Sequence, residues 1–129
     1  MTIESRRQRL IELAESLPEV TVEPGGDDND HLGLSVRDRR FGWYLEDHHD
    51  DGVIALTCKA PPGVNTELAD ADPDRFFIPS YTGPRGWIGV RLDLNEVDWD
   101  HIDHLLEDAY RLTAPKSLVT QMEDNRPLP

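Results

Sequence analysis

Two adjacent histidines among aspartates near the middle of the chain are the first candidates for chemistry. Five consecutive residues share side chains that can bind a metal: Asp47, His48, His49, Asp50 and Asp51. Imidazole and carboxylate groups are ligands for zinc, nickel and copper. The segment EDHHDDG also has the composition of a turn between two strands, where side chains point into solvent. We therefore expect a solvated turn, with His48 and His49 as weak metal candidates.

A second pair of histidines, His101 and His104, is placed three residues apart on an expected helix. Asp108 follows four residues after His104, so the three side chains share one side of that helix. The sequence offers no fourth ligand at this place, and neither pair of histidines matches the signature of a metalloenzyme. We favour an ordinary acidic helix face at His101 and His104, and we expect neither a bound metal nor a cofactor.

Residues that could form a covalent intermediate are not arranged for it. No serine, threonine or cysteine occupies a nucleophile elbow, and the segment TGPRG lacks the lysine and hydroxyl residue of a phosphate-binding loop. The single cysteine, Cys58, falls in the strand-like segment VIALTCK, where a small, buried and unreactive residue is expected. The sequence therefore predicts a binding module and not an enzyme.

The charge of the chain restricts its partners. There are 13 Lys and Arg residues against 26 Asp and Glu residues, a formal net charge of -13, and such a field repels polyanions. The basic residues of the first 45 positions are all arginines, and these are Arg6, Arg7, Arg9, Arg37, Arg39 and Arg40. Contacts of these arginines with phosphates, with the hairpin tip RDRR as a wing along the duplex, constitute a DNA-binding hypothesis. Because no side chains at recognition-helix spacing suggest base reading, we expect such binding to be weak and non-specific.

A protein or peptide is the alternative partner, because an acidic surface does not oppose it and favours a basic one. The segment PSYTGPRGW combines a rigid backbone, aromatic side chains and one cation, and its candidate recognition residues are Tyr81, Arg85 and Trp87. An exposed sheet edge is a second route to such a partner. The same segment also suits a tight connection between two strands, so the sequence leaves the DNA and protein hypotheses both open.

Helical periodicity predicts the two main helices that position these residues. The first runs from Thr2 to about Leu17, and its apolar side consists of Ile3, Leu10, Ala14 and Leu17. The last begins after the N-cap Asp98 and ends near Pro115. Its apolar stripe consists of Ile102, Leu105, Leu106, Ala109 and Leu112.

Alternating apolar residues predict the strands. We expect strands over residues 31–36, 41–45, 53–59, 76–78 and 87–92, and a short helix over residues 64–71. The segment PEVTVEPGGDDNDH, residues 18–31, reads as an exposed connection because it holds two prolines and a pair of glycines. The resulting order, α-β-β-β-α-β-β-α, places the chain in the α+β class.

Length and composition indicate one domain. We expect it to span residues 1–119, with residues 120–129 as a flexible C-terminal tail. No apolar run approaches the roughly 20 residues of a membrane span, and the N-terminal segment MTIESRRQRL lacks the apolar core of a secretory signal. A monomeric cytoplasmic protein with no membrane partner is therefore expected.

Several short motifs follow one another in an informative order. They are LPEV at 17–20, FGW at 41–43, CK at 58–59, ADP at 71–73, PSY at 79–81, GWIGV at 86–90 and AYRL at 109–112. In order and spacing they resemble the MmcQ/YjbR family of small bacterial proteins, over about residues 3–118. The resemblance implies a single antiparallel sheet with helices packed on it. It also implies a DNA-binding module, because family members are commonly labelled so on account of a proposed double-wing motif. The segment PGGDDND departs from the family, which commonly has an aromatic or histidine-containing approach to the first strand there.

Overall fold

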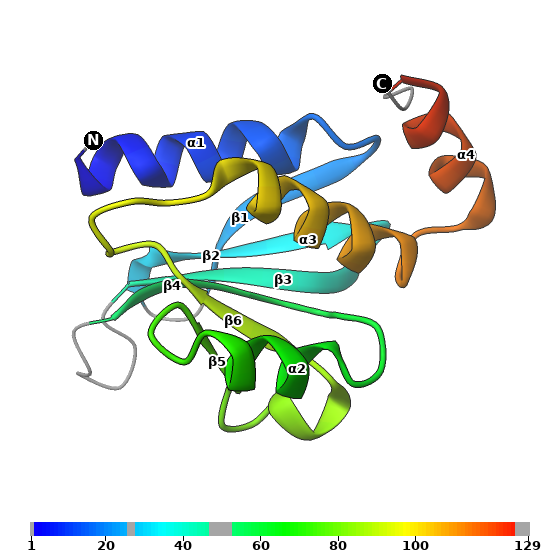
Figure 1. Cartoon of the computed structure of the whole chain (residues 1–129). Helices are drawn as coiled ribbons and strands as arrows, with labels where there is room; N and C mark the ends of the chain where they lie inside the picture. Colours follow the sequence, from blue (N-terminus) through cyan, green and yellow to red (C-terminus); the bar gives the residue numbers. More distant parts are fainter. Residues whose placement is uncertain (1, 26–27, 47–52, 126–129) are drawn as a thin grey trace.

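A computed structural model describes residues 2–25, 28–46 and 53–125. Its elements are α1 (Ile3–Glu15), β1 (Val20–Gly25), β2 (Asp28–Val36), β3 (Arg39–Glu46), β4 (Ile54–Cys58), α2 (Val64–Ala71), β5 (Phe76–Phe77), the 3-10 helix η2 (Gly83–Arg85), β6 (Ile88–Arg91), α3 (Trp99–Arg111) and α4 (Lys116–Asn125) (Figure 1). The α+β class and the single antiparallel sheet with helices packed on it are both confirmed.

The sheet has six strands in the order β1-β2-β3-β4-β6-β5, and every neighbouring pair is antiparallel. Because successive side chains of a strand point to opposite faces, the register separates two faces. The buried apolar residues of one face include Leu32, Leu34, Val36, Leu56, Cys58, Ile88 and Val90. Helices α1 and α3 lie across this covered face (Figure 1), and the hydrophobic core lies between them and the sheet.

Capping side chains fix where the two covering helices begin. The hydroxyl of Thr2 accepts a hydrogen bond from the Ser5 amide at 3.0 Å, and the Asp98 carboxylate accepts one from the His101 amide at 3.1 Å. Helix α3 is also tied to the start of β1, because the Tyr110 hydroxyl donates to the carbonyl of Pro18 at 2.8 Å. The Tyr110 ring meets Phe41 of β3 edge to face, with 6.2 Å between the ring centres.

Strand β1 occupies a stretch that we expected to be an exposed connection, and that expectation is wrong. Residues 20–25 pair with β2, from Val20 opposite Val36 to Gly25 opposite Asp28, with an irregularity between Pro24 and Gly25. Proline is compatible with an edge strand, because one side of such a strand forms no hydrogen bonds with a neighbouring strand. The two prolines and the glycine pair led us to predict a connection where there is a strand. Its side chains at Val20 and Val22 are only half-buried.

The C-terminal part differs from expectation in two ways. Residues 120–125, expected in a flexible tail, belong to α4, which buries Leu118 and Met122 one helical turn apart. Leu112, expected on the apolar stripe of α3, is 49% exposed because the helix ends at Arg111 and the chain turns away. The other four residues of the stripe are buried as predicted.

Candidate binding groove on the uncovered face

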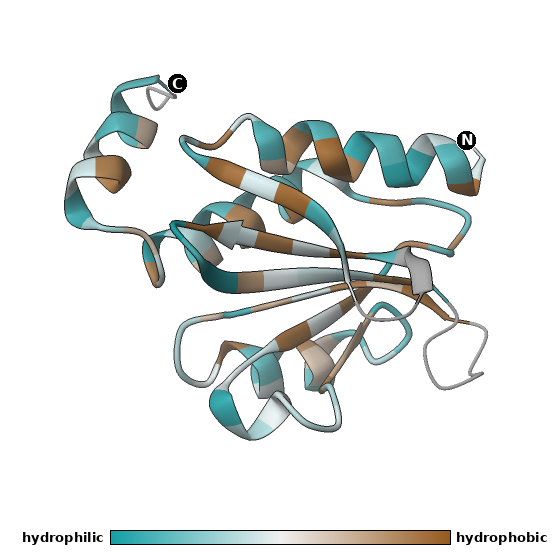
Figure 2. Ribbon diagram, turned by 180° about the vertical axis from the view of Figure 1, so that it is seen from behind, coloured by the Kyte–Doolittle hydropathy of each residue, from teal (hydrophilic) through white to brown (hydrophobic). Residues whose placement is uncertain are grey.

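The second face of the sheet is not covered by α1 or α3. Viewed from behind, strands β2 and β3 have no helix in front of them (Figure 2). The register places on this face Gly33 and Trp43, which are opposite each other, together with the pairs Leu45 with Ala55 and Thr57 with Gly89. We call it the uncovered face.

Glycines on the uncovered face let large side chains lie flat against the backbone. A Cβ at Gly25 would be 2.3 Å from the Trp43 ring, and a Cβ at Gly89 would be 2.4 Å from the Phe77 ring. Both distances are far below van der Waals contact, so these glycines are required where the rings now lie. Trp43 and Phe77 therefore form two aromatic ridges over the strands.

A groove of about 450 Å³ runs between these ridges. Ala55 and Thr57 of β4, both buried, form its floor. Trp43 and Gly25 line one wall, residues 77–82 line the other, and His31, Leu45 and Val53 complete the lining. The volume falls in the range of ordinary ligand pockets, and the predominantly apolar lining suits apolar groups.

The second wall exposes two large apolar side chains. Ile78 is 44% exposed and Tyr81 is 80% exposed. Neither side chain belongs to the hydrophobic core or packs against it. The other exposed large hydrophobic residues among those described, Ile3 and Leu112, lie at or beyond the ends of helices. Exposed apolar side chains that line a groove are a mark of an interaction site.

Helix α2 holds this wall in place through a buried side chain. The amide of Asn65 donates to the carbonyls of Gly83 and Trp87, each at 3.1 Å. Within the wall, the Gly83 amide donates to the carbonyl of Pro79 at 2.8 Å. Asn65 could not be predicted from the sequence, because an asparagine in a short helix has no local feature that reveals partners 18 and 22 residues away.

The polar groups of the groove suit orientation of a ligand. Nε2 of His31 lies 3.0 Å from the carbonyl oxygen of Glu46, so the ring is held at the edge of the groove. The hydroxyl groups in the lining are those of Thr57, Ser80, Tyr81 and Thr82. The arrangement offers apolar contact together with a few hydrogen-bonding groups.

The recognition residues predicted from sequence are separated by the fold. Tyr81 lies in the groove wall. Arg85 is exposed but lines a different, open hollow between α2 and η2. Trp87 is only 6% exposed, so its inclusion in a recognition surface was wrong. The residue lies in the buried segment that leads directly into β6.

The six arginines proposed for DNA do not form one group. Arg6 is buried, and its guanidinium donates to the carbonyls of Leu92, Leu94 and Asn95. Its inclusion among phosphate-binding residues was wrong, because its donors are used to tie α1 to the connection between β6 and α3.

The remaining five arginines have different surroundings. Arg37 forms a two-pronged pair with Glu19 at 3.0 Å, which lowers the pKa of that carboxyl group. Arg7 lies 5.7 Å from the centre of the Tyr44 ring, and Arg40 stacks on Trp43. Arg9 and Arg39 are exposed. Arg37 contacts Glu19 beyond the C-terminal end of α1, whereas Arg9 lies in the middle of that helix, so the two sequence clusters are apart.

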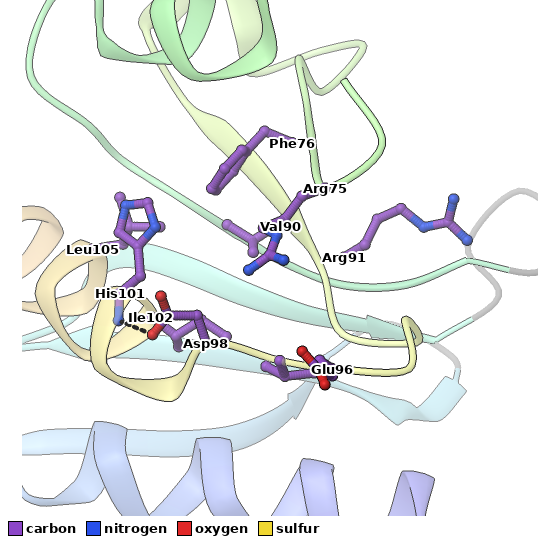
Figure 3. A pocket seen from close by; sticks show the side chains of 10 residues that line it. Arg75, Phe76, Val90, Arg91, Glu96, Asp98, His101, Ile102 and Leu105 are labelled. Atoms are coloured by element: carbon purple, nitrogen blue, oxygen red, sulfur yellow. Dashed lines mark hydrogen bonds between the residues drawn. The ribbon is translucent and has the colours of Figure 1, made fainter. Parts of the chain in front are cut away.

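The histidine candidates are also dispersed. His48 and His49 lie outside the described residues. His104 is exposed, and the His101 ring packs against Phe76 with 5.3 Å between ring centres. The small pocket beside His101, formed with Arg75, Val90 and Glu96, has about 10 Å³, the space of one water molecule (Figure 3). Within the described residues, no three His, Cys, Asp or Glu side chains gather as a metal would require.

Cys58 is buried in the core beneath α3, and burial raises the pKa of its thiol to about 12. Only the thiolate is nucleophilic. We therefore expect iodoacetamide at pH 8 to leave Cys58 unmodified in the folded protein and to modify it in denaturant. Mass spectrometry over a time course checks this, and modification at equal rates in both states would contradict the buried position.

A family model described as YjbR matches residues 15–112. No curated protein matches. The crystal structure of Deinococcus radiodurans protein DR2400, described as domain DUF419, is similar with a TM-score of 0.67 and 23% identity over 93% of this chain and 86% of that chain. A crystal structure of a protein from Pseudomonas syringae is similar with a TM-score of 0.68 and 18% identity over 84% of this chain and 98% of that chain.

No membrane-spanning helix was found: in the described ranges, none is long and apolar enough to cross a bilayer.

Proposed function

Because the chain belongs to the YjbR family, with a matched region that includes the whole groove, we propose that it is a non-enzymatic module that binds an extended segment of a partner protein in this groove. The observation that carries the proposal is the apolar groove of about 450 Å³ on the uncovered face, with Ile78 and Tyr81 exposed along one wall. Apolar side chains of a partner gain free energy by leaving water there.

Charge supports a basic partner. The protein carries a formal net charge of -13, and Glu23 of β1 is exposed on the same face as Gly33. An acidic protein attracts basic segments and speeds their association, and it repels a second copy of itself. The proposed ligand is therefore a peptide segment with basic and apolar residues.

The test uses a basic-apolar pool, which we define as fluorescein-labelled heptapeptides with Lys or Arg in the first three positions and apolar residues in the last four. Fluorescence anisotropy should detect binding to the wild type and at least about fivefold weaker binding to Ile78→Ser, because one apolar contact of this size contributes about 1 kcal/mol or more.

The matched control is Leu112→Ser, which removes a similarly exposed apolar side chain outside the groove. It should bind the pool as the wild type does. Equal weakening by both substitutions, or no binding of the pool at all, would refute the proposal. A pool with serine in place of the apolar residues measures the purely electrostatic contribution.

Weak and non-specific DNA binding is the second candidate, and the exposed side chains of Arg9 and Arg39 support it. We expect dissociation constants no tighter than ~10⁻⁶ M at physiological salt, with a slope of log affinity against log salt of about 0.9 per phosphate contacted. Anisotropy with labelled duplexes over a salt series measures both. Nanomolar and sequence-selective binding that is lost in Arg9→Ala with Arg39→Ala would make DNA the leading candidate.

A further inference from the structure

One arginine beside the groove, Arg40, packs against Trp43 and Gly33. The guanidinium carbon of Arg40 lies 4.3 Å from the centre of the Trp43 ring, which forms a groove wall. Its Nη1 lies over Gly33, where an added Cβ would be 1.1 Å away. Glycine within a strand weakens it and commonly marks a close approach. Here the close approach is that of the Arg40 guanidinium to the β2 backbone.

Within the described part of the chain, Arg40 differs from several other arginines in having no carboxylate partner. Arg37, Arg91 and Arg111 each pair with a carboxylate. Among the described residues, nothing accepts a hydrogen bond from the buried Nη1 of Arg40, and no described carboxylate forms an ion pair with its guanidinium. A guanidinium stacked on an aromatic ring keeps its N–H groups in its own plane, where they can bind a carboxylate through two parallel hydrogen bonds.

We propose that Arg40 binds the C-terminal carboxylate of the peptide segment that the groove takes, an inference that rests on the proposed function. A segment made of basic and apolar residues has no side-chain carboxylate, so the carboxylate that it can offer to Arg40 is the one at the C-terminal end of its chain. Arg40 precedes Trp43 and Leu45 on β3, and both of these residues line the groove. The peptide therefore runs with its terminal carboxylate at Arg40 and its preceding residues past Trp43 and Leu45, over about 17 Å or five extended residues.

The experiment compares the basic-apolar pool with a free C-terminal carboxylate and the same pool with a C-terminal amide. The net charge of the protein alone favours the amide, which carries one more positive charge. We expect the free acid to bind the wild type at least about tenfold more tightly than the amide does. A charge-assisted hydrogen-bonded pair produces a change of this size. A third pool, amidated and with Glu next to its last residue, tests a side-chain carboxylate.

Two variants and one control test whether the preference for the free acid depends on Arg40 in its position against Gly33 and Trp43. Arg40→Gln removes the charge, and Gly33→Ala displaces the flexible end of Arg40 while the strand pairing remains. Both should abolish the preference for the free acid. Arg39→Gln, an exposed neighbour, should retain it.

The outcomes separate this inference from the proposed function. If free acid and amide bind the wild type equally and Ile78→Ser weakens both, the groove stands and the role of Arg40 is overturned. If the Glu-containing amide binds as tightly as the free acid, the assignment to a chain terminus is overturned. If no pool binds, the proposed function fails and this inference fails with it.

Discussion

Replacing Leu106 or Ile102 by alanine is expected to lower the free energy of unfolding by about 2 to 5 kcal/mol each. The two side chains are 0% and 1% exposed at the centre of the α3 stripe, between the helix and the covered face of the sheet. Truncation there removes apolar contacts and leaves a cavity that packed neighbours cannot fill. Urea denaturation followed by circular dichroism measures the change.

Leu112→Ala is the matched control for these core substitutions. It removes the same atoms as Leu106→Ala from a position that is 49% exposed, so the expected loss is below about 1 kcal/mol. A loss below about 0.5 kcal/mol for both core substitutions would mean that the stripe does not pack on the sheet, and the orientation of α3 would be wrong.

The second large effect is expected at Arg6. Substitution by methionine preserves the length of the side chain but leaves the carbonyls of Leu92 and Leu94 without their charged donor. Loss of charge-assisted hydrogen bonds at a buried site should cost about 2 to 4 kcal/mol of unfolding free energy. The same denaturation experiment measures this loss.

Arg9→Met provides the comparison on the same helix, because Arg9 is exposed. It should change the unfolding free energy by no more than about 0.5 kcal/mol. An equally small effect at Arg6 would show that its side chain is not a structural tie, and the DNA hypothesis would regain one of its arginines.

The sequence predicts elements whose information is local. The N-cap at Asp98 and the spacing of Ile102, Leu105 and Leu106 lie within one short segment, so α3 was predictable. The family was predictable because the order of short motifs spans the chain, and the match over residues 15–112 confirms it. Strand β1 was missed because it is held by pairing with β2 and not by its own propensity.

The groove depends on contacts between distant segments. Its floor comes from β4, and its walls come from β3 and from residues 77–82. Tyr81 was a sequence candidate because of its neighbouring turn residues, but nothing local showed that Trp87 would be buried. The glycines at positions 25 and 89 were the available signal, since glycine within a strand often marks a close approach of another group.

The structural role of Arg6 could not be predicted from its neighbours in the sequence. It was grouped with Arg7 and Arg9 because the three are close in sequence. Its partners are backbone carbonyls, the first of them 86 residues away, and backbone groups carry no sequence signal. A helix turn also rotates successive residues by about 100°, so neighbours in sequence face different surroundings.

The indole N–H signals of the three tryptophans, recorded by NMR during addition of the basic-apolar pool, test the central claim most directly. Trp43 lines the groove, whereas Trp99 begins α3 on the covered face. If the groove is the binding site, the Trp43 signal should move progressively with added peptide while the Trp99 signal stays in place. Movement at Trp99 with none at Trp43, at peptide concentrations that saturate the anisotropy signal, would place the binding site elsewhere and contradict the account.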